Sequence, residues 1–236
     1  MADIAKAIEK EKEYLSYRMK NEEPFHLVDA IKECGFEPLE QYFKEKAEYE
    51  FGRLTFTYNE KRPCEAIEYI FKMMDEKKTE LVFVPSDETF VYSGASKPFD
   101  VEYCEANNIP VYPLYTSGGA IVSTIGDFSV VMCYPASTGA DVGYLLEHFK
   151  AIFDKKMQGV EVNGNDLLLG GGKICGSVMY SQNGMSCFAG HFSFEDHSEL
   201  IEKICGVSGS VKTPSVIDKM TVDEFKKAVK AWLQVL

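Results

Sequence analysis

The sequence predicts a mixed α/β fold, and three observations carry this prediction. The first 50 residues are rich in Glu and Lys and have the character of helices, whereas short apolar strands alternate with amphipathic helices from Phe51 onwards. After residue 157, turn signals at 163–164, 170–172 and 183–184 separate short apolar runs, which is typical of a β-meander. At 236 residues the chain suits one large domain with a short appendage. We therefore expect a helical extension over residues 1–50 and one domain over residues 51–236.

The N-terminal extension is expected to contain three helical stretches. Apolar residues at helical spacing mark the first of them. A second is expected over about 27–32, where Gly35 suits the left-handed residue that closes a helix, and a third near 39–49. The charges in this region predict a solvated face, with a partner-binding helix as the alternative.

The domain is expected to begin with strands and helices in alternation. Apolar and aromatic runs predict strands over 54–58, 81–84, 89–92 and 129–134, and an extended segment over 110–114. Apolar residues on one face predict helices over 66–74, 99–107 and 139–157, of which the last is the clearest. His148 lies off the apolar stripe of that helix and is expected at the surface. A final helix is expected after Thr221, because Thr221 and Glu224 have the spacing of a capping box.

Composition excludes some functions and indicates a cytoplasmic protein. The net charge of −12 argues against binding to nucleic acid or to an anionic membrane, because neither polyanion would attract this surface. The three arginines all lie at or before residue 62, so an anion site further along must use lysine, backbone N–H groups or a metal. Seven scattered cysteines without a CxxC pair, with no signal peptide and no apolar run of about 20 residues, predict reduced thiols and no zinc framework.

Lys173 is the strongest candidate for a catalytic residue. It follows Gly170-Gly171-Gly172 at the predicted start of a strand, where sheet backbone would hold it. A lysine held there could bind a carbonyl and a phosphate together, which acyl transfer through an acyl-adenylate requires. The segment is not a nucleotide P-loop, because Leu167 replaces the first glycine and Ile174 replaces the Ser or Thr. A solvated hairpin lysine is the alternative.

Three further segments contain candidate site residues. Adjacent glycines in Ser117-Gly118-Gly119-Ala120 could hold an anion with backbone N–H groups, or could form only a tight turn. Asn165 could exchange hydrogen bonds with a ligand, and Asp166 could bind a ribose hydroxyl, pair with Lys173 or hold magnesium. Turn formation is the alternative for both.

A strand of the meander also contains Cys187 and His191, and a further histidine follows it. Cys187 could act as a nucleophile together with Lys173 or His191, or it could be a small buried apolar residue. His197 falls at a predicted helix start and is expected to be exposed.

Together these segments resemble the lipoate–protein ligase family, within the biotin/lipoate ligase superfamily. Asn165-Asp166-Leu167 is similar to the family's Asn-Asp-Leu motif, and Lys173-Ile174-Cys175-Gly176-Ser177 is similar to its Lys-Ile-x-Gly-Ser motif. Residues 116–121 resemble its glycine-rich motif, and the similarity extends from about Phe51 to the C-terminus. The sequence departs from the family where its paired arginines fall on Pro113 and Leu114, and where its His-His-Gly falls on residues 188–190.

The resemblance implies a mixed, largely antiparallel sheet flanked by helices, with the site on one sheet face. It implies an enzyme that activates lipoate or octanoate with ATP and magnesium. The acyl group would pass to a lysine of a lipoyl carrier domain or an H-protein-like acceptor. Lys173 would be catalytic, and the ligand-binding residues would be Ser117, Gly118, Gly119, Ala120, Asn165, Asp166 and Gly176. No nucleic-acid or membrane partner is expected, and no residue is assigned as a metal ligand.

Two alternative functions stay open. An ATP-independent octanoyl or lipoyl transferase would use a cysteine and a lysine. The resemblance sets Cys187 one residue out of place for that role, which predicts that it faces the wrong side of its strand. A non-catalytic acyl-binding or interaction module on the same scaffold would explain the missing arginines.

Overall fold

The computed structural model of the chain describes residues 37–93, 99–113, 120–206, 215–216 and 218–234. The chain divides into two compact units, one of residues 1–53 and 138–140 and one of residues 54–137 and 141–236. In the first unit the described element is helix α3 (Glu37–Phe51), which confirms the helix expected near 39–49. The helices expected before residue 37 lie outside the described residues.

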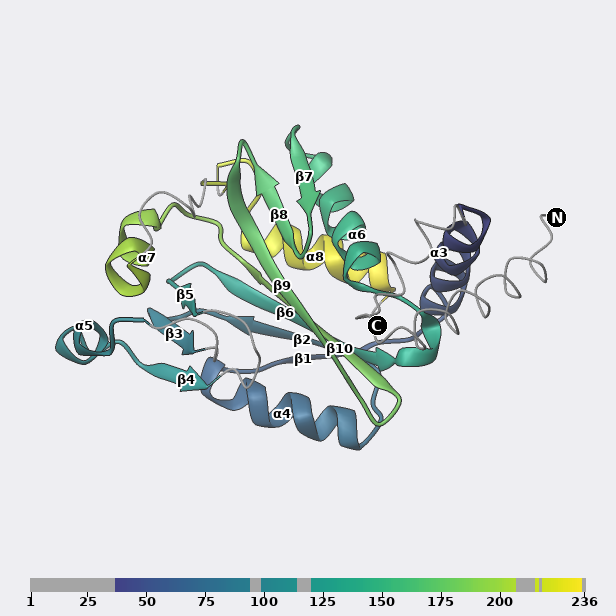
Figure 1. Ribbon diagram of the computed structural model, residues 1–236, viewed down its shortest axis with the longest axis horizontal. Coiled ribbons are helices and arrows are strands. Elements are labelled where there is room, and N and C mark those ends of the chain that lie inside the picture. The colour runs from purple at the N-terminus through teal and green to yellow at the C-terminus, as the bar shows by residue number, and fades with distance from the viewer. Residues whose placement is uncertain (1–36, 94–98, 114–119, 207–214, 217, 235–236) are drawn as a thin grey trace, which may run out of the picture. The chain divides into compact units, whose positions relative to one another are not determined.

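The second unit is built on a seven-stranded sheet (Figure 1). Only β1 and β2 pair in parallel, and every other neighbouring pair of this sheet is antiparallel. This confirms the mixed, largely antiparallel sheet. In spatial order the strands are β1 (Thr57–Glu60), β2 (Glu80–Pro85), β6 (Phe128–Pro135), β10 (Met185–Phe192), β9 (Gly172–Gln182), β8 (Asp166–Leu169) and β7 (Val160–Asn163).

A smaller, three-stranded sheet accompanies the large one. Its strands, in spatial order, are β4 (Val111–Pro113), β3 (Phe90–Ser93) and β5 (Ile121–Ser123). Helices α5 (Val101–Ala106) and α7 (Ser198–Cys205) supply Cys104 and Ile204, which pack with Val91 and Val122 in a separate core. The sequence did not predict β5, because three residues are too few to show the alternation of a strand.

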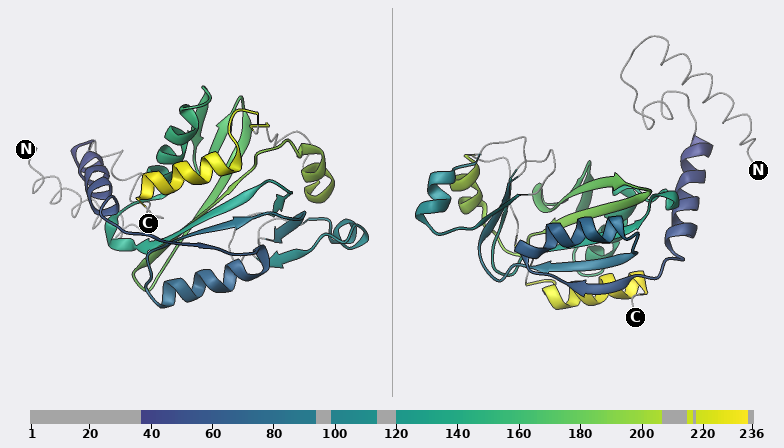
Figure 2. Two further views of the ribbon diagram at one scale, coloured as in Figure 1. Left: turned by 180° about the vertical axis from the view of Figure 1, so that it is seen from behind. Right: turned by 90° about the horizontal axis from the view of Figure 1, so that it is seen from below.

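The two faces of the large sheet carry different cores, because successive strand residues point to opposite sides. Helices α6 (Val142–Asp154) and α8 (Val222–Leu233) cover one face, where the rings of Phe149, Phe192 and Phe225 lie 4.8 to 6.0 Å apart. Helix α4 (Pro63–Asp75) packs its aliphatic residues on the other face. Figure 2 shows α4 and α8 on opposite sides of β1 and β2.

The helix ends follow the expected capping chemistry, with one difference in exposure. The Thr221 hydroxyl accepts from the Glu224 N–H and the Glu224 carboxylate accepts from the Thr221 N–H, which confirms the capping box of α8. His148 was expected at the surface, but it is half-buried and its ring stacks on Trp232 with centroids 4.7 Å apart. The prediction was wrong because α8, which is distant in sequence, covers that side of α6. Among the described residues, no helix is both long and apolar enough to cross a membrane.

Candidate functional site

Lys173 lies near the start of β9, directly after a tight turn. Gly170 and Gly171 adopt φ values of +58° and +79°, and a two-residue β-hairpin turn of this kind needs the left-handed conformation at both positions. This confirms the predicted strand, glycine turn and second strand. The Lys173 Nζ atom lies 2.7 Å from Asp166 Oδ1, and the two side chains are 36% and 35% exposed. Three roles were considered for Asp166, and the structure shows one of them, the ion pair with Lys173.

A β-bulge sets the direction of the Lys173 side chain. Asp166 of β8 is opposite Gly176 and Leu168 is opposite Lys173, so β9 contains one residue more than β8 between these two pairs. Residues 166 and 168 share a face of the sheet, and their partners therefore share it too. In an uninterrupted strand, residues 173 and 176 would face opposite sides. The bulge thus brings Lys173 and Gly176 to the same face.

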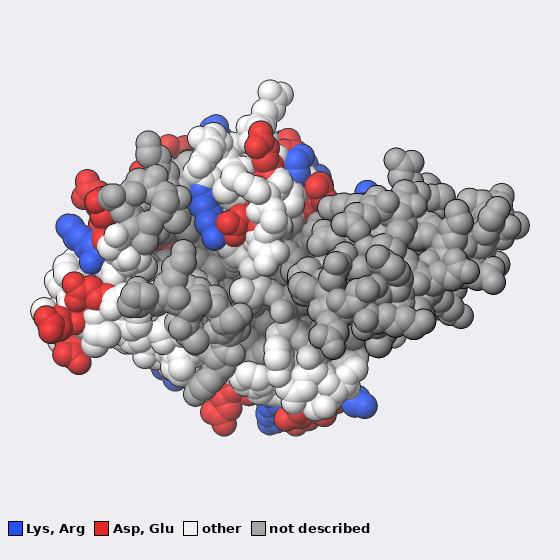
Figure 3. Space-filling view, in the orientation of Figure 1, with Lys and Arg blue, Asp and Glu red and all other residues white. Residues whose placement is uncertain are grey.

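Gly176 leaves the space that the lysine occupies. A Cβ atom at this position would lie 2.7 Å from Lys173 Cε and 2.9 Å from Nζ. These distances are shorter than a van der Waals contact, so any larger residue would displace the lysine. In the orientation of Figure 1, Figure 3 shows a basic and an acidic side chain adjoining over β8 and β9.

The hairpin brings together part of the predicted site. Asn165, Asp166, Lys173 and Gly176 all belong to it, and the Asn165 main-chain carbonyl accepts from the Ser177 N–H at 2.9 Å and the Ser177 hydroxyl at 2.8 Å. Ala120, in contrast, packs on the core of the small sheet. Ser117, Gly118 and Gly119 lie outside the described residues.

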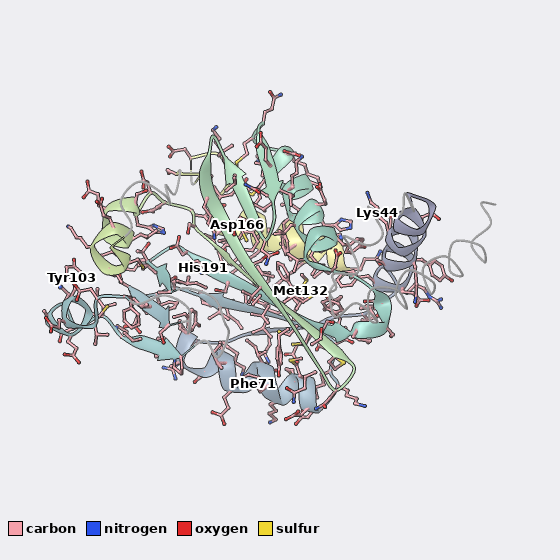
Figure 4. All side chains as sticks on the ribbon, viewed as in Figure 1. Lys44, Phe71, Tyr103, Met132, Asp166 and His191 are labelled. Carbon is pink, nitrogen blue, oxygen red and sulfur yellow. The ribbon has the colours of Figure 1, made fainter. Side chains whose placement is uncertain are left out.

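His191 extends this site along the same sheet face. On β10, His191 is directly opposite Gly176, and on its other side it is opposite Ser129 of β6. The residues of such a cross-strand row point to the same face, so His191 lies beside the position that Lys173 fills (Figure 4 labels Asp166 and His191). Its Nδ1 atom lies 3.1 Å from Ser129 Oγ. Sequence reasoning noted His191 but did not place it next to the lysine.

Next to His191 lies a buried carboxylate that sequence reasoning did not select. Asp127 is 2% exposed, and its Oδ1 accepts from the Phe194 N–H at 3.0 Å. Its Oδ2 accepts from the Thr124 N–H at 3.0 Å and lies 3.1 Å from His197 Nε2. Asp127 therefore joins the turn before β6 to the segment after β10.

His197 was predicted to be exposed, and this was wrong. It is 8% exposed, and its Nδ1 atom lies 3.2 Å from the Thr124 hydroxyl. The local pattern correctly placed it at the start of α7. The contact that buries it joins residues 73 positions apart, which a local pattern does not show.

Burial keeps the His191 imidazole neutral. It lowers the pKa of His191 to about 4, since desolvation disfavours the imidazolium and outweighs the attraction of Asp127, while His197 and Lys173 act in the same direction as burial. An unfolded histidine titrates near pH 6.5. Between these values the unfolded chain binds a proton that the folded chain does not bind.

The stability of the fold is therefore expected to fall in acid. The contribution of His191 is present in full above pH 6.5 and is lost as the pH falls towards 4, which amounts to roughly 2 kcal/mol between pH 7 and pH 5. Urea denaturation at the two pH values measures this loss. In His191→Gln the loss should be smaller by about that amount, whereas equal losses in the two proteins would contradict the assignment.

Cys187 lies on the same face as Lys173, contrary to the prediction. Residues 187, 189 and 191 alternate with the aromatic residues of β10, and Cys187 packs in the core beneath α4. The prediction failed because comparing faces on two strands requires their pairing register and the bulge. Cys187 and His191 are four residue steps apart, or about 14 Å along a strand. A hydrogen bond with Cys133 and burial raise the pKa of the Cys187 thiol well above its ordinary value, which disfavours the thiolate.

The site as described offers a cation, a glycine gap and a neutral imidazole rather than a metal centre. Within the described ranges, no group of three or more His, Cys, Asp or Glu side chains could hold a metal ion. An ammonium group beside a neutral ring suits an anionic ligand, and the half-buried Val178 and Ala189 lie one step further along the same face.

The fold and this hairpin define the class of protein. Residues 61–234 match the model of the lipoyl protein ligase A/B catalytic domain. This match covers well over half of the chain, and the chain therefore belongs to the lipoyl protein ligase A/B catalytic domain family.

Solved structures agree on the fold. LipL1 of P. falciparum, in complex with lipoate, has a TM-score of 0.66 at 10% identity over 77% of this chain and 60% of its own. A bipartite lipoate protein ligase of Thermoplasma acidophilum, studied with its E2 lipoyl domain, has a TM-score of 0.66 at 14% identity. The alignment covers 78% of this chain and 86% of that chain. Lipoate-protein ligase A bound with ATP has a TM-score of 0.62 at 16% identity, and the alignment covers 77% of this chain and 87% of that chain.

A curated sequence supports the same family over a shorter segment. It comes from Aeropyrum pernix, is assigned provisionally as a lipoate-protein ligase A, and is 28% identical over 89 residues. These residues are 36% of this chain and 34% of that protein. The match thus spans about a third of the length of the curated relative, and this chain spans 60% of the LipL1 structure.

Proposed function

We propose that this chain is a lipoate–protein ligase that activates lipoate or octanoate as an acyl-adenylate. The acyl group then passes to a lysine of a lipoyl carrier domain or an H-protein-like acceptor. Residues 51–236 form the catalytic domain and residues 1–50 an extension to it. The Lys173–Asp166 pair on the family's hairpin is the observation that carries the proposal.

Lys173 acts on the charge that develops during the reaction. An ammonium group has three N–H donors, and the contact with Asp166 Oδ1 uses one of them. The remaining donors bind the acyl carbonyl oxygen and an oxygen of the α-phosphate. Such donors, fixed in place before the reaction, stabilise a transition state more than flexible ones do, and the bulge and the Gly176 gap fix this lysine.

The proposed reaction has two steps. An oxygen of the acyl carboxylate attacks the α-phosphorus of ATP, a new P–O bond forms, and pyrophosphate leaves. The amine of the carrier lysine then attacks the acyl carbon, and AMP leaves as the amide forms and a proton is released. Ser117, Gly118 and Gly119 line the path of the acyl and phosphate groups, and Asn165 and Asp166 hold the nucleotide. Ala120 and Gly176 belong to the same set of ligand-binding residues.

ATP is the proposed co-substrate, and one solved relative is bound with ATP. Magnesium is usually held by one or two carboxylates together with substrate phosphates. Asp166 could provide one such oxygen, and the described residues contain no complete cage of side chains. We therefore expect magnesium to enter with the nucleotide rather than to reside on the protein.

A carrier-lipoylation assay tests the proposal. The chain is incubated with lipoate, Mg-ATP and a purified lipoyl carrier domain, and the mass of the carrier is measured. Modification that requires ATP supports the proposal. Absence of modification, together with no binding of a lipoyl-adenylate, would leave the acyl-binding or interaction module as the better description.

The same assay separates the ATP-independent transferase. Here an octanoyl thioester on an acyl carrier replaces octanoate and ATP, and a thioester on Cys187 is sought by mass spectrometry. The burial of Cys187 beneath α4 and its raised thiol pKa argue against this route. Transfer without ATP through a modified Cys187 would nevertheless overturn the leading proposal.

Gly176→Ala is expected to reduce transfer without unfolding the protein. The added Cβ would displace the flexible end of Lys173, and a misplacement of about 1 Å can cost on the order of 100-fold in rate. Stability should change little, because the atoms that move belong to a side chain that is one-third exposed. Initial rates and melting temperatures measure the two effects. Gly143→Ala is the control, since its Cβ would lie at an ordinary 3.5 Å from Asp141 Oδ1. A Gly176→Ala rate equal to that of this control would contradict the proposed role of the gap.

A further inference from the structure

His191 contains a buried nitrogen for which the described part of the chain supplies no hydrogen bond. Its side chain is 8% exposed, and the Nε2 atom is shielded from solvent without a partner. The nearest carboxylate oxygen, Asp127 Oδ2, lies 3.8 Å away, beyond hydrogen-bonding distance. A buried polar group is costly to leave unpaired, so this nitrogen calls for a partner beyond the described residues.

The surroundings of the ring indicate that this nitrogen carries a hydrogen. The imidazole is neutral, so one ring nitrogen donates and the other accepts. A lone pair on Nε2 would face the negative Asp127 carboxylate, whereas an N–H there faces it favourably. The Ser129 hydroxyl can then donate to Nδ1 across the observed 3.1 Å. His191 therefore has an Nε2–H donor in need of an acceptor.

Asp127 is poorly placed to become that acceptor. Its Oδ2 already receives hydrogen bonds from the Thr124 N–H and hydroxyl, and it lies 3.1 Å from His197 Nε2. Moving this carboxylate towards His191 would lengthen those contacts.

Lys173 identifies the kind of acceptor. His191 is opposite Gly176, and the ammonium group of Lys173 fills the space above that glycine. The ammonium group of Lys173 and the ring of His191 thus belong to neighbouring positions on one sheet face, although both ring nitrogens lie on the side of His191 that faces Ser129 and Asp127. Val178 and Ala189 are the next cross-strand pair on this face and are half-buried, and Ala189 packs against the core beneath α4, so an aliphatic chain attached to the anion would extend towards them.

We propose that His191 Nε2–H and Lys173 Nζ together bind the carboxylate of the acyl substrate, one donor to each oxygen. The aliphatic chain then lies over Val178 and Ala189. His191 acts here as a residue that positions the substrate, and the inference rests on the proposed function. Since Nε2 is shielded, the carboxylate reaches it only if the ring turns or its cover moves, and binding therefore changes the environment of the ring.

Octanoate and 1-octanol are the probes that test this proposal. The two molecules share the aliphatic chain, and only octanoate has the carboxylate. The chain is labelled with ¹⁵N-histidine, the ring nitrogens of its four histidines are observed by NMR, and both probes are titrated. We expect the neutral Nε2–H form at His191 at pH 7 and a shift of its Nε2 signal on addition of octanoate. The ring of His148, stacked on Trp232, should not respond.

Variants give the energetic test. A hydrogen bond to a charged group is worth about 1.5–3 kcal/mol, so His191→Leu should weaken octanoate binding by about 10- to 100-fold and leave octanol binding unchanged. His191→Gln, which keeps an N–H donor, should recover part of the affinity. His148→Leu is the matched control and should bind octanoate as the wild type does.

The outcomes separate this inference from the function on which it rests. If octanoate does not bind, or if Lys173→Ala binds it as well as the wild type, the proposed function fails. If octanoate binding depends on Lys173 but His191→Leu weakens octanoate and octanol equally, or neither of them, only the role of His191 fails. An ordered water on Nε2 that stays in place in an octanoate complex would also overturn that role.

Discussion

Lys173→Ala is expected to lower the rate of carrier lipoylation by about 100- to 1,000-fold. The substitution removes a charged donor placed where negative charge develops, and the loss of one such donor typically has an effect of this size. Stability should change by less than about 1 kcal/mol, because the pair with Asp166 is one-third exposed and such pairs contribute little. Initial rates over a range of lipoate concentrations show whether kcat or KM carries the loss.

Lys150→Ala is the matched control for this experiment. Lys150 pairs with Asp154 at 2.5 Å, and their side chains are 30% and 37% exposed, so the pair resembles the Lys173 pair in contact and exposure. It lies on α6 rather than on the β8–β9 hairpin. The control should keep the rate of the wild type. A Lys173→Ala enzyme within about threefold of this control would show that Lys173 is not the catalytic residue.

Asp127→Ala is expected to destabilise the fold by about 3–5 kcal/mol. The carboxylate accepts the main-chain N–H groups of Phe194 and Thr124 and contacts His197, and all of these would lose their buried acceptor. Each unsatisfied buried donor costs about 1–3 kcal/mol, and the removal of one member of a buried charged network usually has an effect of the size given. Urea denaturation at pH 7 measures the change.

Asp154→Ala is the control, because it also removes an aspartate but not one that lies in a buried network. Its pair with Lys150 lies near the surface, so the expected loss is below about 1 kcal/mol. If Asp127→Ala is no less stable than Asp154→Ala, the donors around Asp127 must find other partners, and Asp127 would not hold the two segments together.

The sequence predicted the elements whose signals are local. Paired glycines with left-handed backbone mark the β8–β9 turn, and the reciprocal bonds of Thr221 and Glu224 mark the start of α8. The motif residues Asn165, Asp166, Lys173 and Gly176 lie within twelve positions of one another, so one hairpin brings them together. Their roles remain predictions, as does the role of Ala120.

The remainder of the candidate site depends on contacts between distant segments. His191 reaches Lys173 only through the pairing of β9 with β10, and His197 is buried by the turn that contains Thr124 and Asp127. The face of Cys187 was predicted wrongly for the same reason. The pattern of a single strand shows which of its residues share a face. Only the pairing of two strands shows which of those faces lie on the same side of the sheet.

The extra residue in β9 also matters for anyone who compares or redesigns such hairpins. If β9 were assumed to alternate regularly back from Gly176, Lys173 would be assigned to the phenylalanine-rich face of the sheet. Its pairing with Leu168 of β8 assigns it to the opposite face, which is correct. Relatives are therefore best superposed on the strand that corresponds to β8 rather than on the strand that contains the lysine. In a designed hairpin with the same side chains but no bulge, the ammonium group would point into the apolar core. The proposed catalytic role of the lysine would then be lost although no side chain had changed.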